Sequence, residues 1–194
     1  MLHLELVKPS TPPELLEKVG RLRYEVFCLE EGRPYESHEG KILDSLEVCS
    51  VSFLISIGPR NIGTIRFTPK IPHTVLELEI VNPEWEKIIA TTPKEHTCEM
   101  SRFAVLKDYR GTAIPYELIL NAFRYALERD FFYVYIPGKV GVLERFYRSL
   151  GFIKLTKQPT EYSLGAYHLM FLDLRNQKII KRLVELKNQR ARKN

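Results

Sequence analysis

The sequence predicts one folded domain of the mixed α/β class, and three observations support this. The chain has 194 residues, enough to bury a full hydrophobic core. Hydrophobic residues make up 44% and charged residues 27% of it, which is typical of globular proteins and excludes a disordered chain. Stretches whose apolar residues have helical spacing alternate with short apolar stretches that are typical of strands.

The first predicted helix has a clear apolar stripe. Pro12 and Pro13 open this helix, since proline suits the first helical turn, and it is expected to reach about Glu31. Its apolar residues recur at steps of three and four: Leu15, Leu16, Val19, Leu22, Val26 and Phe27. A strand is predicted before it at residues 3–8. The loop at 32–46 after it is too long for a simple connector, which suggests a function.

Turn residues separate the later elements. Strands are predicted at 48–57 and 63–69, joined by a hairpin turn at 58–61 that contains glycine, proline and asparagine. Residues 70–95 are expected to be irregular, with a short helix near Trp85. The remaining strands are predicted at 98–106, 131–136, 152–156 and 163–173, and the remaining helices at 113–129, 139–150 and 176–194.

Several classes of protein are excluded by what the sequence lacks. No stretch approaches the roughly 20 apolar residues that span a bilayer, and the first residues do not resemble a signal peptide, so the expected location is the cytoplasm. Cys28, Cys49 and Cys98 have no C-x-x-C spacing, and the histidines are scattered. We therefore expect no metal site and no disulfide framework. The motifs of serine hydrolases and of P-loop nucleotide triphosphatases are also absent.

The positive charge is concentrated at the C-terminus. The net charge of the chain is +5, while residues 176–194 carry seven bases and one acid, a local +6, which leaves 5 − 6 = −1 for residues 1–175. We expect a domain at 1–175 with a basic helix at 176–194. Nucleic-acid binding is not expected, because such proteins more often spread bases over a whole face. A solvated helix end, a docking surface for an acidic partner and peripheral contact with a membrane are the alternatives for this helix.

Four charged residues lie in apolar surroundings. Arg23 lies at the edge of the first helix's apolar stripe, and Arg66 lies within an apolar strand. Glu99 and Arg102 belong to another apolar strand, where strict alternation puts them on opposite faces unless a bulge intervenes. Buried charges require partners. The pattern indicates either a functional site or a purely structural ion network.

Two later segments have a recognisable chemistry. At residues 105–113 a strand leads into a helix, and the unpaired N–H groups at such a helix start can hold a phosphate, although an ordinary turn has the same residues. The helix at 139–150 carries Tyr147 and is followed by Gly151 and Phe152, which gives the pattern Y-x-x-x-G-F.

Together these features resemble the GNAT superfamily of N-acyltransferases over residues 3–174. The N-terminal half is similar to the acyl-homoserine-lactone synthases and the N-acyl amino acid synthases. The matching motifs are R-x-x-x-F (Arg23, Phe27), D-x-x-E (Asp44, Glu47), G-T-I-R-F (Gly63 to Phe67) and E-M-S-R-F (Glu99 to Phe103). The resemblance implies a mixed, mostly antiparallel central sheet flanked by helices, in a GNAT-like arrangement.

The resemblance also implies a reaction, in which an amine attacks a thioester on a phosphopantetheine arm. Lactone synthases usually have a tryptophan in the loop where this chain has Arg33-Pro34-Tyr35. They usually have an aspartate at the position where this chain has Glu47. These departures favour an amino acid or a related small amine as the acceptor. The alternatives are a homoserine-lactone synthase that uses S-adenosylmethionine and a short-chain acetyl-CoA-dependent N-acetyltransferase. A non-catalytic acyl-binding or nucleic-acid-binding module is the alternative of a different class.

The resemblance assigns roles to particular residues. Glu99 is the expected base and Tyr147 the expected acid for the departing thiolate, which suits a phenol that keeps its proton at neutral pH. The expected acceptor-binding residues are Arg23, Phe27, Asp44, Arg66 and Arg102. The expected donor-binding residues are Phe103, Val105, Arg110, Gly111, Thr112 and Ala113. No metal and no permanently bound cofactor are expected.

The turn at residues 105–113 also suggests the donor. A typical acetyl-CoA site has a second glycine where Ala113 stands, and Pro115 has no N–H. Fewer donors suit one phosphate better than a pyrophosphate, which favours the phosphopantetheine of an acyl-carrier protein over coenzyme A. Because carrier proteins are acidic, the basic C-terminal helix is a candidate docking surface for this partner.

Overall fold

A computed structural model describes residues 1–162 and 165–192. The first two positions of the strand predicted at 163–173, and the last two of the basic helix predicted at 176–194, lie outside the described residues. The chain forms two compact units. The first comprises Met1–Phe67, Arg102–Ala122 and Val184–Asn194, and the second comprises Thr68–Ser101 and Phe123–Leu183.

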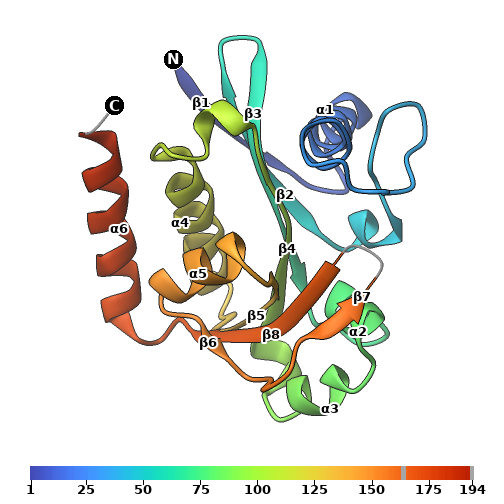
Figure 1. The fold of residues 1–194 in the computed structure, drawn as a ribbon, viewed down its shortest axis with the longest axis vertical. Helices are drawn as coiled ribbons and strands as arrows, with labels where there is room; N and C mark the ends of the chain where they lie inside the picture. Colours follow the sequence, from blue (N-terminus) through green and yellow to red (C-terminus); the bar gives the residue numbers. More distant parts are fainter. Residues whose placement is uncertain (163–164, 193–194) are drawn as a thin grey trace. The chain divides into compact units, whose positions relative to one another are not determined.

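The strands of the first unit form an antiparallel arrangement. Strand β1 (Leu2–Val7) pairs with β2 (Val51–Ile57), and β2 pairs with β3 (Arg60–Pro69) in a hairpin (Figure 1). Strand β4 (Thr97–Val105) is the next in the sheet order. Both β3 and β4 continue from one unit into the other.

The first helix is shorter than predicted. Helix α1 covers Pro13–Tyr24, and the chain continues as a π-helical turn, η1, at Glu25–Glu30. The Glu31 N–H donates to the Val26 carbonyl, five residues back, at 3.1 Å. This wider turn inserts an extra residue into the helical repeat, and π-turns of this kind are frequent at functional sites.

The first unit requires a small residue at Gly63. Helix α4 (Ile114–Leu127) packs against β3 there, and a Cβ on Gly63 would lie 2.8 Å from Cδ1 of Leu118.

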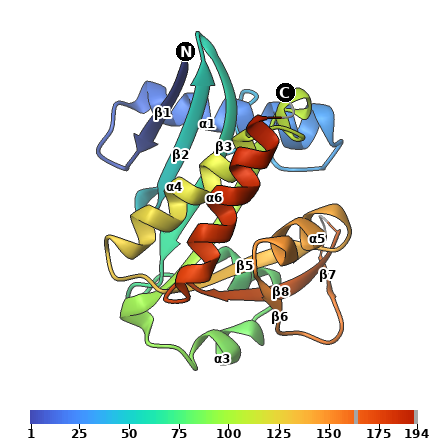
Figure 2. The same ribbon diagram turned by 90° about the vertical axis from the view of Figure 1, so that its left-hand side faces the viewer.

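Next to α4 lies the basic C-terminal helix α6 (Gln177–Ala191), as Figure 2 shows. Lys187 of α6 and Glu117 of α4 form an ion pair at 2.9 Å.

The second unit contains the one parallel pairing described. Thr97 to Glu99 of β4 run parallel to β5 (Tyr133–Lys139), and β5 is antiparallel to β8 (Gly165–Asp173). The short strands β6 (Ile153–Lys154) and β7 (Thr160–Tyr162) both pair antiparallel with β8. The sheet is therefore mixed and mostly antiparallel, which confirms the predicted fold class.

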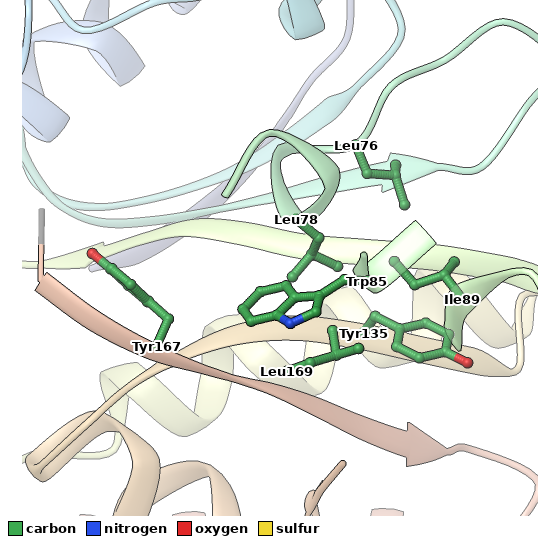
Figure 3. Packing of buried hydrophobic residues seen from close by; sticks show 7 residues of the cluster. All are labelled: Leu76, Leu78, Trp85, Ile89, Tyr135, Tyr167 and Leu169. Carbon is green, nitrogen blue, oxygen red and sulfur yellow. The ribbon is translucent and has the colours of Figure 1, made fainter. Parts of the chain in front are cut away.

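Three short helices complete the second unit. They are α2 (Glu77–Val81), α3 (Trp85–Ile89) and α5 (Val142–Ser149). The first two carry residues of a buried apolar cluster on one face of β5 and β8 (Figure 3). Its members are Leu76, Leu78, Trp85, Ile89, Tyr135, Tyr167 and Leu169. Residues 70–95 were predicted to be irregular with one short helix near Trp85, and burial of this cluster explains why they also contain the ordered helix α2.

Helix α2 and strand β7 were not predicted. They have five and three residues, too few to show an apolar period in the sequence. The short 3₁₀ turns η2 (Ser45–Val48), η3 (Lys94–His96) and η4 (Lys107–Tyr109) are similar in this respect. Within the described parts of the chain, no helix has both the length and the apolar character to cross a bilayer.

Replacing Gly63 with valine is expected to destabilise the protein. The new side chain overlaps Leu118, which is fully buried and has little room to turn away, so we expect a loss of about 1–3 kcal/mol in the free energy of unfolding. Urea denaturation measures this. Gly111→Ala is the control, since a Cβ there meets no atom within 4 Å, and its effect stays within about 0.5 kcal/mol. Equal stability of the two variants would contradict the proposed packing.

Candidate active site

Five charged side chains of the first unit form a continuous chain of ion pairs, which we call the arginine–carboxylate network. Nη1 of Arg23 lies 2.5 Å from Oε1 of Glu47, and Nη1 of Arg66 lies 3.0 Å from the same oxygen. Arg66 also reaches Oδ1 of Asp44 at 2.6 Å, and Nη2 of Arg102 reaches Oδ2 of Asp44 at 2.8 Å. The network thus runs from Arg23 through Glu47, Arg66 and Asp44 to Arg102.

The two carboxylates come from one short turn. Asp44 caps the 3₁₀ turn η2 and accepts a hydrogen bond from the Leu46 N–H at 3.0 Å. Residues three apart in a 3₁₀ turn lie on the same side. The spacing D-x-x-E therefore directs Asp44 and Glu47 to one side of the turn, towards the arginines.

Sheet register places the arginines. Ser52 of β2 lies opposite Arg66 of β3 in the antiparallel pairing, so their side chains are on the same face of the sheet. Nη2 of Arg23 donates to the Ser52 hydroxyl at 2.9 Å. Arg23 therefore joins the last turn of α1 to this face of the β2–β3 hairpin.

Arg102 reaches the network through an irregularity in β4. Its backbone has φ = +51°, in the left-handed region that few residues other than glycine adopt. Such a residue interrupts the alternation of a strand, as in a β-bulge. The sequence left open whether a bulge would re-aim Glu99 or Arg102, and the structure has the irregular residue at Arg102.

Exposure differs from one end of the network to the other. Arg23 and Arg66 are 0% exposed, whereas the side chains of Arg102 and Asp44 are 12% and 28% exposed. Burial lowers the pKa of the Arg23 guanidinium, and the Glu47 carboxylate opposes this shift. Partial burial alone would raise the pKa of Asp44, but Arg66 and Arg102 outweigh it and hold the pKa below its ordinary value. Asp44 is therefore an ionised group that solvent reaches.

Aromatic rings adjoin this exposed end. Phe27 stacks on Tyr35, with ring centroids 5.2 Å apart, and the Arg102 guanidinium lies 5.0 Å from the Tyr35 centroid. Arg33 lies 5.1 Å from the Phe27 ring. Tyr35 was not among the predicted site residues. The only indication in the sequence was its position in the loop where lactone synthases usually have a tryptophan.

The turn before α4 is held by side chains. The Thr112 hydroxyl donates to the Tyr109 carbonyl at 2.7 Å and accepts from the Ile114 N–H at 3.2 Å. Arg110 donates through Nε to the Val105 carbonyl at 2.8 Å, and its Nη2 pairs with Glu30 at 2.5 Å. The Arg110 guanidinium thus joins this turn to the end of η1, and its expected role in holding the donor stays a prediction.

The remaining donor-binding candidates lie along β4 and the same turn. Phe103 is partly buried, Gly111 is exposed, and Ala113 lies directly before α4. Pro115, in the first turn of α4, supplies no N–H. Together with the bond from Ile114 to Thr112, this leaves few backbone donors for an anion at the helix start.

The candidate base and acid belong to the second unit. Glu99 on β4 is 0% exposed, and its Oε2 accepts a hydrogen bond from the Leu78 N–H at 3.1 Å. Tyr147 on α5 is buried, with its ring 5.7 Å from that of Phe146 and 5.6 Å from that of Phe152. Among the described residues, no group of three or more histidine, cysteine, aspartate or glutamate side chains is arranged to hold a metal ion.

Comparison with protein families identifies the chain. The family model described as an acetyltransferase (GNAT) domain matches residues 22–119, which is 98 of the 194 residues. The chain is a member of the GNAT family. The matched region contains the whole arginine–carboxylate network and the turn before α4. The predicted family is thereby confirmed, and with it an N-acyltransferase type of enzyme.

Several solved structures share the fold over most of the chain. A CoA-dependent acyl-homoserine lactone synthase, BjaI, solved with S-adenosylmethionine and isopentyl-CoA, is 20% identical with a TM-score of 0.76, over 97% of this chain and 90% of its own. The acyl-homoserine lactone synthase LasI is 17% identical with a TM-score of 0.70, over 93% and 94%. ElaA from Escherichia coli is 18% identical with a TM-score of 0.67, over 89% and 100%. A search of curated protein sequences found no significant match.

Removing the shared carboxylate of the network is expected to be costly. Glu47→Gln leaves Arg23 and Arg66, both fully buried, without the negative charge that they share, so we expect a loss of about 3–5 kcal/mol in the free energy of unfolding by urea. Glu17→Gln, which breaks a more exposed pair with Lys41, is the control and costs less than about 1 kcal/mol. A similar small cost for Glu47→Gln would show that the network does not hold the unit together.

The contribution of Asp44 to stability is expected to depend on pH. Its pKa is lower in the folded state than in an unfolded chain, because of Arg66 and Arg102. The stabilisation is therefore fully present above the unfolded pKa of about 3.9 and is lost as the pH falls through the folded value. Urea denaturation of the wild type and Asp44→Asn between pH 7 and pH 3 measures this. The difference in stability shrinks at the acid end; a constant difference would contradict the ion pairing.

Proposed function

We propose that this GNAT protein transfers an acyl group from a phosphopantetheine thioester to the α-amine of a small acceptor that also carries a carboxylate. The observation that carries the proposal is the exposed end of the arginine–carboxylate network. Asp44 and Arg102 are its two most exposed members, and they present opposite charges side by side. An amino-acid type of acceptor carries the complementary pair, an ammonium and a carboxylate, on one carbon atom.

The members of the network have different roles in this proposal. The guanidinium of Arg102 matches a carboxylate in shape, because its planar fork offers parallel N–H donors. Asp44, ionised at neutral pH, receives the acceptor's ammonium. Arg23 and Arg66 pair with Glu47, and Arg66 also pairs with Asp44, so their proposed role is to hold these two carboxylates in place.

The acyl transfer requires the acceptor nitrogen to lose two protons, one before and one after attack, and the departing thiolate to gain one. The acceptor's ammonium must first lose a proton, for which Glu99 is the proposed base, directly or through one water. The amine nitrogen then attacks the thioester carbonyl, and backbone N–H groups near Phe103 and Val105 stabilise the oxyanion. The C–N bond forms as the C–S bond breaks, and Tyr147 gives the departing thiolate its proton. The attacking nitrogen then releases its second proton, which restores the Tyr147 phenol and leaves the neutral amide.

The donor is proposed to be held at the start of α4, around Gly111, Thr112 and Ala113. The small number of backbone donors there favours the single phosphate of a carrier-protein arm. BjaI, which shares the fold, is described as CoA-dependent. Both donors therefore belong in the test, and the basic helix α6 is the proposed surface for an acidic carrier protein.

The first candidate acceptor is S-adenosylmethionine. The similar structures include several acyl-homoserine lactone synthases, and BjaI is described with this molecule. The amide product of such an acceptor can cyclise, because its carboxylate displaces methylthioadenosine and closes a lactone.

A free amino acid is the second candidate, and one observation favours it. Phe27 stacks on the Tyr35 ring, and Arg102 lies over that ring. An acceptor with a cationic sulfonium would therefore compete with a guanidinium for the aromatic surface. An amino acid without a second positive charge avoids this competition.

Mass spectrometry of products tests the proposal. Purified wild-type protein is incubated with acyl-carrier protein or acyl-CoA and with S-adenosylmethionine or a mixture of amino acids. We expect a new acylated amine, and Glu99→Gln is expected to reduce kcat by about 100-fold or more. Glu95→Gln, an exposed glutamate of the same unit, is the matched control and retains the wild-type rate.

Each outcome identifies a reaction. A lactone together with methylthioadenosine establishes the first acceptor, and an acyclic N-acyl amino acid establishes the second. The absence of any acylated amine with both donors contradicts the proposed transferase. A Glu99→Gln variant that is as active as wild type contradicts the assignment of the base.

A further inference from the structure

A second buried ion pair lies in the second unit, outside the arginine–carboxylate network. Nζ of Lys70 lies 2.5 Å and 2.8 Å from the two carboxylate oxygens of Glu79. The side chains are only 10% and 7% exposed. Burying two charges costs several kcal/mol per ion, so an apolar pair of similar size is often as stable or more stable. Stability alone therefore does not account for this pair.

Lys70 joins the segment after β3 to the start of β4. Its backbone N–H donates to the Thr97 carbonyl at 2.9 Å, two residues before Glu99. Its Nζ donates to the Thr74 carbonyl at 2.9 Å as well as to Glu79. One residue thus holds the chain at three points between β4 and the beginning of α2.

Glu79 holds the start of α2. Its Oε2 accepts a hydrogen bond from the Leu76 N–H at 2.9 Å, as a glutamate does at the third position of a helix. Helix α2 has only five residues, and a helix of this length does not persist without tertiary contacts. Its orientation therefore depends on this bond and on the side chains of Leu76 and Leu78, which pack in the buried cluster (Figure 3).

The first turn of α2 contacts the Glu99 carboxylate of β4. While the Leu78 side chain packs towards Trp85, the Leu78 N–H donates to Oε2 of Glu99 at 3.1 Å. The neighbouring residue Cys98 is affected by this carboxylate. Burial raises the pKa of the Cys98 thiol, and the negative charge of Glu99 raises it further. A continuous series of bonds thus leads from Lys70 through Glu79 and α2 to the proposed base.

We propose that Lys70 and Glu79 are positioning residues for Glu99, whose ion pair holds the Leu78 N–H against the carboxylate. The proposal rests on the proposed function, in which Glu99 takes the proton of the acceptor. The pair keeps α2 at a fixed distance from β4, and α2 supplies a donor that favours the ionised form of the base. Neither residue is among the proposed substrate-binding residues.

The double variant Lys70→Met/Glu79→Met tests this role without leaving an unpaired buried charge. We expect faster hydrogen exchange at the Leu78 amide and a decrease in kcat/KM of about 10- to 100-fold, because small displacements of reacting groups are costly. The acid limb of the kcat/KM–pH profile moves to higher pH, because a carboxylate that loses a hydrogen-bond donor holds its proton more tightly. Lys70→Arg, which keeps the charge, retains most of the activity and the wild-type pH profile.

The control removes another ion pair of the same unit. Arg175→Met/Asp173→Asn breaks the exposed pair at the end of β8 and is expected to leave the acid limb and the Leu78 amide unchanged. Wild-type protection of Leu78 in the Lys70/Glu79 double variant overturns the proposal. So does faster exchange with an unchanged kcat/KM and pH profile, since the pair would then be merely structural.

Failure of the proposed function is visible separately. A wild-type protein without turnover overturns the transferase reaction, and the positioning role with it. A wild type that turns over while Glu99→Gln is equally active removes Glu99 as the base and overturns the positioning role, but leaves the transferase reaction standing.

Discussion

The buried guanidinium of Arg23 is the constraint on which the first unit depends. It is fully enclosed, and it joins α1 to the Ser52 hydroxyl on the sheet and to the Glu47 carboxylate of the loop. An unpaired charge in this position would cost several kcal/mol. The charge of Arg23 therefore constrains where three segments lie: the loop at residues 32–46, the turn η2 and the β2–β3 hairpin. Ion pairs set the position of the C-terminal end of the long loop.

The network combines rigidity at one end with access at the other. Arg66 lies between Glu47 and Asp44, so that the buried half orients the carboxylate that solvent reaches. Asp44 and Arg102 are then held in a fixed relation before any ligand binds. Such preorganisation lowers the entropic cost of binding and orienting an acceptor. The strained backbone of Arg102 is consistent with this, because left-handed conformations persist where the surrounding structure holds them in place.

The second unit uses a similar arrangement on a smaller scale. A buried lysine and a buried glutamate organise a five-residue helix whose backbone N–H meets Glu99. In both units, a charged side chain with a proposed chemical role is held by charged residues behind it, and not by apolar packing alone. Ion pairs have directional geometry that apolar contacts lack, which suits groups whose orientation matters for a reaction.

The sequence by itself determined the fold class, the family and which charges are anomalous, because apolar periodicity, turn residues and short motifs are local properties of the chain. It singled out Arg23, Arg66, Glu99 and Arg102 through their apolar neighbours. Only the tertiary structure decided which of these charges meet: that Glu47 is shared by two arginines, that Tyr35 lies between Phe27 and Arg102, and that Lys70 and Glu79 act on α2. The physical reason is that partners distant in the chain are chosen by sheet register, by the left-handed backbone of Arg102 and by a π-turn. A shift of one residue in any of these re-aims every side chain that follows it.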